Sequence, residues 1–302
     1  MADVVLQNIR KTYNKNSVVA VDDVSFEVEK GELFGLIGSD GAGKTSIFRI
    51  LTTLLLPDGG AASVNGFDVV KNYKDIRNKV GYMPGRFSLY QDLSVEENLN
   101  FFATVFNTTI KANYDLIKEI YVQLEPFKNR RAGKLSGGMK QKLALCCSLI
   151  HRPTVLFLDE PTTGVDTVSR KEFWDMLNRL KQQGITILVS TPYMDEATLC
   201  ERIALIQSGK IMSINTPQTI VNQFPEKLYA VKANNMSKLL TDLRLNEQVE
   251  SCNAFGEYHH ITLKQTKGDE IAELKNNLQS HTEVEVKIIT PTIEDCFIKL
   301  MN

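Results

Sequence analysis

The residues with the clearest chemistry form the run Gly38-Ser39-Asp40-Gly41-Ala42-Gly43-Lys44-Thr45. This Gly-x-x-x-x-Gly-Lys-Thr spacing is that of a phosphate-binding loop. Because glycine has no Cβ and can adopt positive φ, several backbone N–H groups of such a loop can converge on one anion. Lys44 would place a full positive charge against the β- and γ-phosphates, and the Thr45 hydroxyl would hold Mg²⁺. The spacing therefore predicts a site for a nucleoside triphosphate with Mg²⁺, and we include the next residue, Ser46, in it.

The flanking sequence supports this interpretation. Leu33 to Ile37 is an apolar run typical of a buried strand, and a helical pattern extends from Lys44 to about Leu54. The unpaired N–H groups and the positive end of that helix would face the same point as the loop. A glycine-rich turn before a lysine is the alternative, and the bare pattern arises on the order of once per hundred chains of this length. A strand before it and a helix after it make that alternative rarer still.

A second chemical feature is a pair of carboxylates at the end of an apolar strand, Val155-Leu156-Phe157-Leu158-Asp159-Glu160. Carboxylates at the carboxyl end of a buried strand are costly unless they meet a cation or a ligand, and ligands bind at that edge of an open α/β sheet. Asp159 can hold Mg²⁺ opposite Thr45, and Glu160 can polarise a water for attack on the γ-phosphate. The alternative is two acidic residues that merely end a strand.

Two further features are weaker when taken alone. Leu135-Ser136-Gly137-Gly138-Met139-Lys140-Gln141 is a second glycine-rich entry into a helix, so Ser136, Gly137 and Gly138 could bind an anion, or Ser136 could be an ordinary N-cap. Tyr13 precedes a polar turn and could stack on a purine ring, although an aromatic at a strand edge is more often plain packing.

Strands alternate with helices along most of the chain, which predicts an α/β fold with a mainly parallel sheet and helices on both faces. The segment of about 86–150 is mostly helical, and Thr216-Pro217 marks a boundary near residue 218. We therefore expect one domain over residues 1–218 and a second over 219–302. The second follows a β-α-β-β-α-β order, with its second helix expected over 269–278, which is typical of a ferredoxin-like α+β unit. Because this tail has no glycine-rich loop and no metal-ligand spacing, a regulatory or docking module is its default interpretation.

Composition limits the possible classes of function. The 302 residues carry a net charge of −1, so no general attraction to nucleic acid or to an anionic membrane is expected. The longest apolar runs fall far short of the ~20 residues that cross a bilayer, and the first residues do not resemble a signal peptide. We expect a cytoplasmic protein. Its five cysteines form no C-x-x-C pair and are predicted to be buried free thiols.

Taken together, residues 3–218 resemble the nucleotide-binding subunit of ATP-binding cassette (ABC) transporters. Gly38–Thr45 matches the Walker A motif of that family, Val155–Asp159 matches Walker B, and Glu160 matches the catalytic glutamate. Leu135–Gln141 matches the signature motif, Thr163–Asp166 matches the D-loop, and Tyr13 falls where the family has its adenine-stacking aromatic.

The tail, which ends in Thr290-Pro291-Thr292-Ile293-Glu294-Asp295-Cys296-Phe297, resembles the C-terminal extension of ABC-2 type exporter subunits. The resemblance implies a P-loop NTPase fold with a RecA-like core, an antiparallel β subdomain and a helical subdomain. It also implies ATP and Mg²⁺ as cofactors, export of drugs, lipid or polysaccharide through a separate membrane permease, and a place on the inner face of the plasma membrane. No nucleic acid is implied.

In this family two cassettes pair head to tail, and each ATP lies between the Walker motifs of one and the signature of the other. Phe87, Leu89 and Tyr90, expected to be exposed, lie in the segment where the family docks a helix of the permease. An ATP-gated regulatory cassette that dimerises without driving transport is the alternative function. Relatives that act on ribosomes or DNA usually join two cassettes or insert long coiled coils, which are absent from this sequence.

Two positions depart from the family pattern. Gly85 stands where the family has a glutamine that contacts Mg²⁺, and Pro192 stands where it has a histidine that contacts the γ-phosphate. Glycine offers no side chain and proline no N–H donor, so neither replaces the missing group. We therefore expect a site that binds ATP but turns over slowly. The favoured hypothesis is a heterodimer with a different cassette, and the alternative is a slow homodimer helped by Arg86 or Tyr193.

Overall fold

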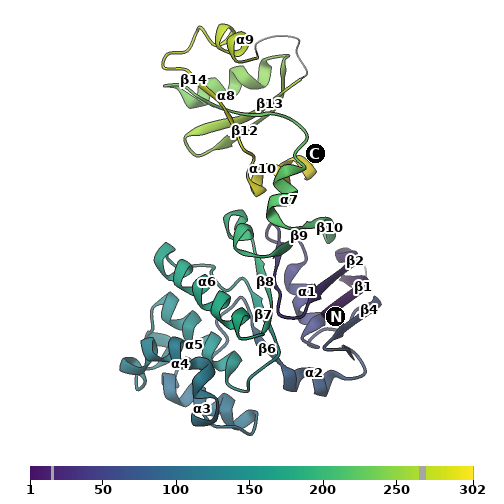
Figure 1. Cartoon of the computed structure of the whole chain (residues 1–302), viewed down its shortest axis with the longest axis vertical. Coiled ribbons are helices and arrows are strands. Elements are labelled where there is room, and N and C mark those ends of the chain that lie inside the picture. The colour runs from purple at the N-terminus through teal and green to yellow at the C-terminus, as the bar shows by residue number, and fades with distance from the viewer. Residues whose placement is uncertain (15–16, 265–269, 302) are drawn as a thin grey trace. The chain divides into compact units, whose positions relative to one another are not determined.

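The computed structural model describes residues 1–14, 17–264 and 270–301, and these form two compact units, residues 1–217 and 218–300 (Figure 1). The larger unit contains every residue proposed above to contact nucleotide. Each unit is described by itself.

The centre of the larger unit is a six-stranded sheet with the order β10-β9-β3-β8-β7-β6. Five neighbouring strands are parallel, and only β10 pairs antiparallel, at one edge. Every residue of β3 and of β7 is buried, as expected for strands covered on both faces. The mainly parallel sheet predicted from the sequence is confirmed. The strands are β3 (Leu33–Ile37), β6 (Val80–Met83), β7 (Val155–Asp159), β8 (Thr186–Thr191), β9 (Arg202–Gln207) and β10 (Lys210–Asn215).

A second, antiparallel sheet has the order β2-β1-β4-β5. Helix α1 (Lys44–Leu51) contacts β2 and β4 of this sheet and β7 of the parallel sheet, so it lies between the two. Its buried side chains Ile47, Phe48 and Leu51 belong to one hydrophobic core that both sheets share. This core fixes the helix that follows the phosphate loop. The strands are β1 (Ala2–Tyr13), β2 (Val18–Glu29), β4 (Gly59–Val64) and β5 (Phe67–Asp68).

The helical segment packs against the parallel sheet at its edge strand β6. Helix α5 (Gly137–Leu149) contacts α3 (Val95–Val105), α4 (Tyr114–Leu124), β6 and α6 (Thr167–Gln182). A capping box starts α3: the Ser94 hydroxyl accepts from the Glu97 backbone N–H, and the Glu97 carboxylate accepts from the Ser94 backbone N–H. A short helix, α2 (Tyr73–Lys79), contacts β5 and β6.

The smaller unit has the order β12-β13-β11-β14 in a fully antiparallel sheet. Its strands β11 (Leu228–Lys232), β12 (Val249–Phe255), β13 (Tyr258–Leu263) and β14 (Glu285–Ile289) alternate with α8 (Met236–Leu245) and α9 (Glu270–Asn277). This is the ferredoxin-like β-α-β-β-α-β arrangement. Residue 269, the expected start of the second helix, lies outside the described residues. The remaining helices are α7 (Pro217–Asn222) and α10 (Ile293–Met301).

Two sequence predictions about chain-wide properties can also be compared with the structure. All five cysteines are buried free thiols, as predicted, and burial raises the pKa of the Cys252 thiol to about 11. In the described ranges, no helix combines the length and the apolar character that crossing a bilayer requires.

Candidate nucleotide-binding and catalytic site

The phosphate loop connects β3 to α1 and bounds a cavity of about 140 Å³. Gly43 has φ 105°, and a Cβ there would lie 2.2 Å from the Ala20 carbonyl oxygen. A Cβ on Gly38 would lie 2.1 Å from the Ile206 carbonyl oxygen. Glycine is therefore required at both ends of the loop, at Gly38 by close packing and at Gly43 by packing and φ. The cavity is lined by Ala20, Gly41, Ala42, Gly43, Lys44, Thr45, Ser46 and Glu160.

Lys44 is the buried cation of this loop, with 3% of its surface exposed. Its Nζ donates to the carbonyl oxygens of Gly38 at 2.8 Å and Ser39 at 3.0 Å, and it lies 3.2 Å from Glu160 Oε1. A buried ammonium group is stable only when oxygen atoms surround it in this way. The structure thus brings Lys44, which the sequence predicted to contact the phosphates, next to Glu160, which it predicted to polarise the attacking water.

Asp159 and Glu160 are held at the end of β7 by the neighbouring strand β8. The Ser190 hydroxyl donates to Asp159 Oδ1 at 2.6 Å and accepts from the Glu160 backbone N–H at 3.0 Å. Glu160 has φ 51°, a left-handed conformation that costs a residue with a Cβ roughly 1–2 kcal/mol. Sequence reasoning missed Ser190, although it is also a polar residue ending a buried strand at the same edge of the sheet.

The donor atoms at this edge fit a hard divalent cation. Asp159 is 2% exposed, and Thr45 lines the adjacent cavity. Carboxylate and hydroxyl oxygens are the ligands that Mg²⁺ prefers. Burial and, secondarily, the charge of Asp159 raise the pKa of Tyr82 to about 12. Asp159 is buried, so a cation or hydrogen-bond donors beside its carboxylate would offset the cost of that burial.

Of the two positions that depart from the family pattern, Gly85 lies beside the acidic end of β7. A Cβ on Gly85 would be 3.0 Å from the Asp159 carbonyl oxygen and 3.7 Å from Glu160 Cβ, so the segment passes beside both acids without a side chain. Pro192 directly follows Thr191, the last residue of β8. The next side chain, Tyr193, has its ring centre 4.3 Å from the Arg170 guanidinium carbon.

The buried carboxylate of Glu196 accepts hydrogen bonds from three segments of the larger unit. It is 2% exposed and accepts from Thr162 Oγ1 at 2.8 Å, from Thr191 Oγ1 at 2.6 Å, and from Arg170 Nε at 3.0 Å. These partners come from the loop after β7, the end of β8 and helix α6. Glu196 itself lies in the short 3₁₀ helix Met194–Leu199, a polar segment whose sequence gave no signal of a buried ionic group.

Other predicted site residues lie around the loop. The Tyr13 hydroxyl is 3.0 Å from Ser46 Oγ, which connects the end of β1 to α1. Ser39 Oγ donates to Gln207 Oε1 at 2.6 Å at the end of β9, and Asp40 is exposed.

The signature residues are not among those lining the cavity. Ser136 is the N-cap of α5, and its Oγ accepts from the Met139 backbone N–H at 3.4 Å. A Cβ on Gly138 would lie 2.6 Å from Ser169 Oγ, and one on Gly137 would lie 3.3 Å from the Gly164 carbonyl oxygen. Gly137 and Gly138 therefore pack against the D-loop and the start of α6, and none of the three signature residues lines the phosphate-loop cavity of the same chain.

Comparison with known proteins agrees with these observations. Residues 21–163 match the family model described as "ABC transporter". The chain is 36% identical over 306 residues to the probable multidrug ABC transporter ATP-binding protein YbhF of Escherichia coli (strain K12), in an alignment that covers 100% of this chain and 52% of YbhF. The chain thus spans about half the length of that relative.

In two further comparisons, the aligned region covers most of the length of the protein compared with this chain. The Nod factor export ATP-binding protein I of Burkholderia pseudomallei (strain 1710b) is 38% identical over 224 residues, covering 73% of each chain. A solved structure titled "Structure of ATP binding subunit of ABC transporter" superposes with a TM-score of 0.66 at 26% identity, covering 73% of this chain and 92% of the other.

The position of Lys44 gives a first test. Lys44→Ala is expected to weaken Mg·ATP binding roughly 10- to 100-fold, because a hydrogen bond to a charged group contributes about 1.5–3 kcal/mol. Isothermal titration calorimetry would measure the affinity. Lys30→Ala, which changes an exposed lysine before β3, is the control and should bind as the wild type does. Equal affinities of the two variants would contradict the role of Lys44.

The Glu196 cluster gives a second test, on stability. Arg170→Ala leaves the Glu196 carboxylate buried without its cation, which should cost on the order of 3–5 kcal/mol of unfolding free energy. Arg179→Ala on the same helix removes an exposed pair with Glu119 and should cost about 1 kcal/mol or less. Urea denaturation of the two variants would compare them, and similar losses would show that Glu196 does not depend on Arg170.

The phosphate loop, the acidic strand end and the start of the signature helix thus occur in one α/β unit. All three lie within residues 21–163, which match the family model. The chain belongs to the ABC transporter family, within the group of ATP-binding proteins that includes those of ABC-2 type exporters.

Proposed function

We propose that this chain is an ATP-hydrolysing subunit that powers export through a separate membrane permease. The observation that carries the proposal is the contact of Lys44 with Glu160 at 3.2 Å inside the phosphate-loop cavity. It places a phosphate-binding cation and a candidate general base at the same point. Relatives named as multidrug and Nod factor export ATP-binding proteins support export as the direction.

In this proposal, different residues of the chain bind the phosphates, hold Mg²⁺ and activate water. Backbone N–H groups of residues 38–45 bind the phosphates, Lys44 exchanges loop carbonyls for phosphate oxygens, and Ser46 with Tyr13 borders the nucleotide. Thr45 and Asp159 would hold Mg²⁺, which neutralises phosphate charge. Glu160 then orients a water and accepts its proton, while Ser190 keeps the Asp159 carboxylate and the Glu160 backbone in place.

A second cassette is needed to complete each site. The signature residues Ser136–Gly138 lie at the start of α5 and outside the cavity, so they are available to a nucleotide held by another chain. The signature is intact, whereas Gly85 and Pro192 leave this chain's own site without two side-chain contacts. This imbalance supports a heterodimer in which the chain completes a faster site on its partner.

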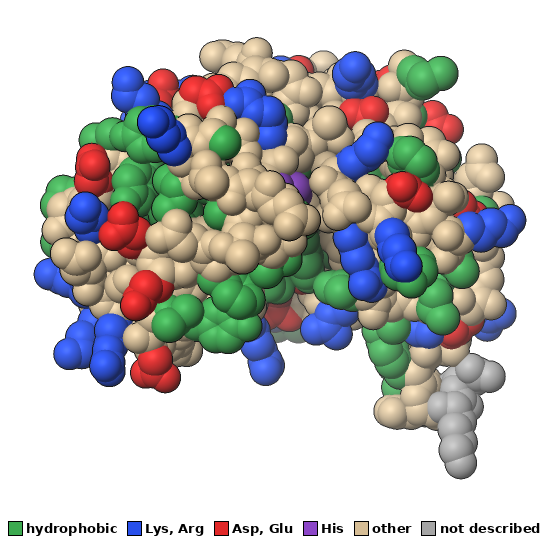
Figure 2. All heavy atoms as spheres, turned by 90° about the horizontal axis from the view of Figure 1, so that it is seen from below, with side chains coloured by type: hydrophobic (Ala, Val, Ile, Leu, Met, Phe, Trp, Pro, Cys, Tyr) green, Lys and Arg blue, Asp and Glu red, His purple; other side chains and the backbone are tan. Residues whose placement is uncertain are grey.

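The proposed permease contact is a groove of about 590 Å³ between the helical segment and the parallel sheet. Figure 2 shows this face, where hydrophobic side chains gather in the middle. Phe102, Val105 and Phe106 of the helical segment line the groove, together with Pro84 and Leu89. The expectation that Leu89 is exposed was wrong: it is 8% exposed because it packs into the groove wall, whereas Tyr90 is 51% exposed. Docking here would place the chain on the inner face of the membrane.

Restoring the two absent side chains tests the proposed slow site. Gly85→Gln/Pro192→His is expected to raise the kcat of the purified chain for ATP by roughly 10²-fold, because one preorganised donor to developing charge is worth about 10²–10³. The Cβ that the first substitution adds would lie 3.0 Å from the Asp159 carbonyl oxygen, so one of the two segments must shift slightly to accept it. A phosphate-release assay would give the rates.

Adding Glu160→Gln to the double variant is the control, and it should abolish the gain while ATP affinity stays measurable. A wild-type rate as high as that of the double variant would contradict a slow site. Loss of ATP binding by the double variant would instead indicate a damaged fold, so affinity is measured in parallel.

The permease contact has its own test. Val105→Glu introduces a charge into the groove at a side chain that is 55% exposed, and it should abolish co-purification with a multi-span membrane protein. Val122→Glu, at a 49% exposed position on α4 outside the groove, is the matched control. If both variants retain the membrane protein, or if the wild type retains none, permease docking at this groove is wrong.

A further inference from the structure

A cluster of cations surrounds helix α2 on the face of the larger unit shown in Figure 2. Four basic side chains occur within nine residues, and all four are exposed: Lys71, Lys74, Arg77 and Lys79. Among the residues that the structure describes, none of the four forms an ion pair. The acids of the same segment are Asp75, which is exposed, and Asp68, whose carboxylate accepts from the backbone N–H groups of Val70 and Lys71. This local excess of positive charge is hidden in the chain's net charge of −1.

Large apolar side chains lie beside these cations. Arg77 donates from Nε to Thr53 Oγ1 at 2.8 Å and from its terminal nitrogen to the Thr53 carbonyl at 2.9 Å, which ties the loop after α1 to α2. That loop exposes Leu54 and Leu56, Val70 is exposed three residues before α2, and Tyr73 is exposed at the first position of α2. Exposed apolar groups at this density on one surface commonly mark a contact with a partner or a membrane.

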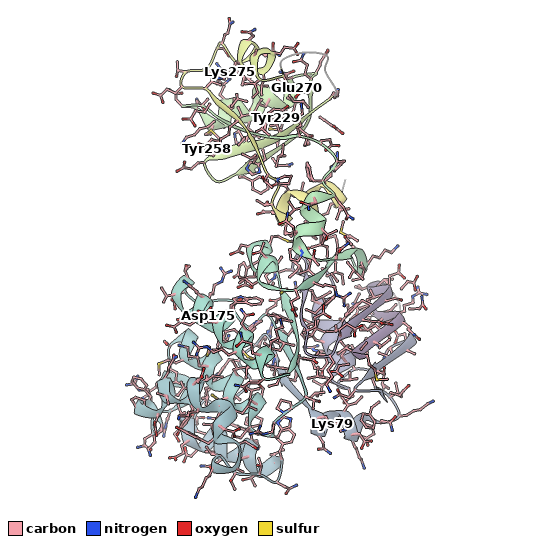
Figure 3. All side chains as sticks on the ribbon, in the orientation of Figure 1. Lys79, Asp175, Tyr229, Tyr258, Glu270 and Lys275 are labelled. Carbon is pink, nitrogen blue, oxygen red and sulfur yellow. The ribbon has the colours of Figure 1, made fainter. Side chains whose placement is uncertain are left out.

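The cations are also arranged around an aromatic ring. The Arg77 guanidinium carbon lies 5.2 Å from the centre of the Tyr73 ring, and Lys74 Nζ lies 6.0 Å from it. Tyrosine is typical of the membrane–water interface because its ring is apolar and its hydroxyl is polar. Lysine and arginine there keep their charge in the headgroup layer while their stems contact apolar atoms. Lys79, labelled in Figure 3, extends the same surface at the end of α2.

We propose that this α2 patch, formed by Lys71, Lys74 and Lys79 with Leu56, Val70 and Tyr73, contacts the surface of an anionic phospholipid bilayer; Arg77 and Leu54 border it but line the groove assigned above to the permease. Charge complementarity identifies the occupant. The three lysines are exposed on or beside a helix and do not line the groove, so they match a continuous layer of phosphate groups better than one acidic side chain. The interspersed apolar groups add contact with the acyl boundary. The proposal does not depend on ATP hydrolysis.

The test is binding of the full-length chain, without nucleotide, to vesicles in a flotation assay. We expect binding to vesicles of equimolar phosphatidylcholine and phosphatidylglycerol and little binding to phosphatidylcholine alone. Each cation near an anionic surface strengthens binding roughly fivefold. Lys71→Glu/Lys74→Glu should therefore weaken partitioning at least about 25-fold. Raising the salt concentration should weaken the wild type in the same direction.

Lys118→Glu/Lys238→Glu is the matched control, since it makes the same change in net charge at two exposed lysines outside the patch. It should bind anionic vesicles within about twofold of the wild type, because distant exposed charges are screened. Tyr73→Ser should lower the binding that persists at high salt, which reports the apolar part of the contact.

Three outcomes would overturn the proposal. The first is equal binding to neutral and anionic vesicles, and the second is equal loss in the patch variant and the control. The third is a wild-type chain that does not bind vesicles but binds soluble polyglutamate. In that case the binding would weaken with salt and would be lost in the patch variant. That result would assign the patch to an acidic protein segment. Since no nucleotide is present, none of these results bears on whether the chain hydrolyses ATP.

Discussion

The site depends on one constraint, the alignment of parallel strands so that their carboxyl ends meet at one edge. β3 leads into the phosphate loop, β7 ends in Asp159, and β8 ends in Ser190 and Thr191, and these strands are direct neighbours in the order β3-β8-β7. Residues far apart in the sequence therefore meet as Lys44–Glu160 and Asp159–Ser190 pairs. The shared core around α1 fixes the position of the helix that follows the phosphate loop, because this helix is buried between two sheets.

Much of this arrangement could be predicted because it is encoded locally. The phosphate loop is a contiguous run with glycine where the backbone requires it, and the strand before Asp159 is a continuous apolar run. The alternation of strands and helices indicated the parallel sheet, and the order of elements in the tail indicated the ferredoxin-like unit. Contacts between distant segments were harder to predict. Glu196 lies in a polar turn, and its burial depends on Thr162, Thr191 and Arg170, which no local pattern connects to it.

Leu89 illustrates the same limit. It lies in the segment where the resembled family docks a helix of the permease, so an exposed side chain was expected. Its burial depends on how the helical segment packs against the parallel sheet, because Leu89 shares the wall of the groove with Phe102 and Phe106. The α2 patch was missed for the opposite reason. Net charge sums all charges of the chain, including those far from the patch. The electrostatic energy of a surface contact depends mainly on charges within about one Debye length, ~10 Å at about 0.1 M salt.

The backbone at Glu160 has a consequence for how this sequence can change over time. Glycine or asparagine adopts a left-handed conformation at lower cost than glutamate, so the backbone alone favours replacing this residue. Its carboxylate acts in the opposite direction, because it lies 3.2 Å from the buried ammonium group of Lys44. Two opposing contributions to stability therefore meet at one residue, and any substitution there changes both at once.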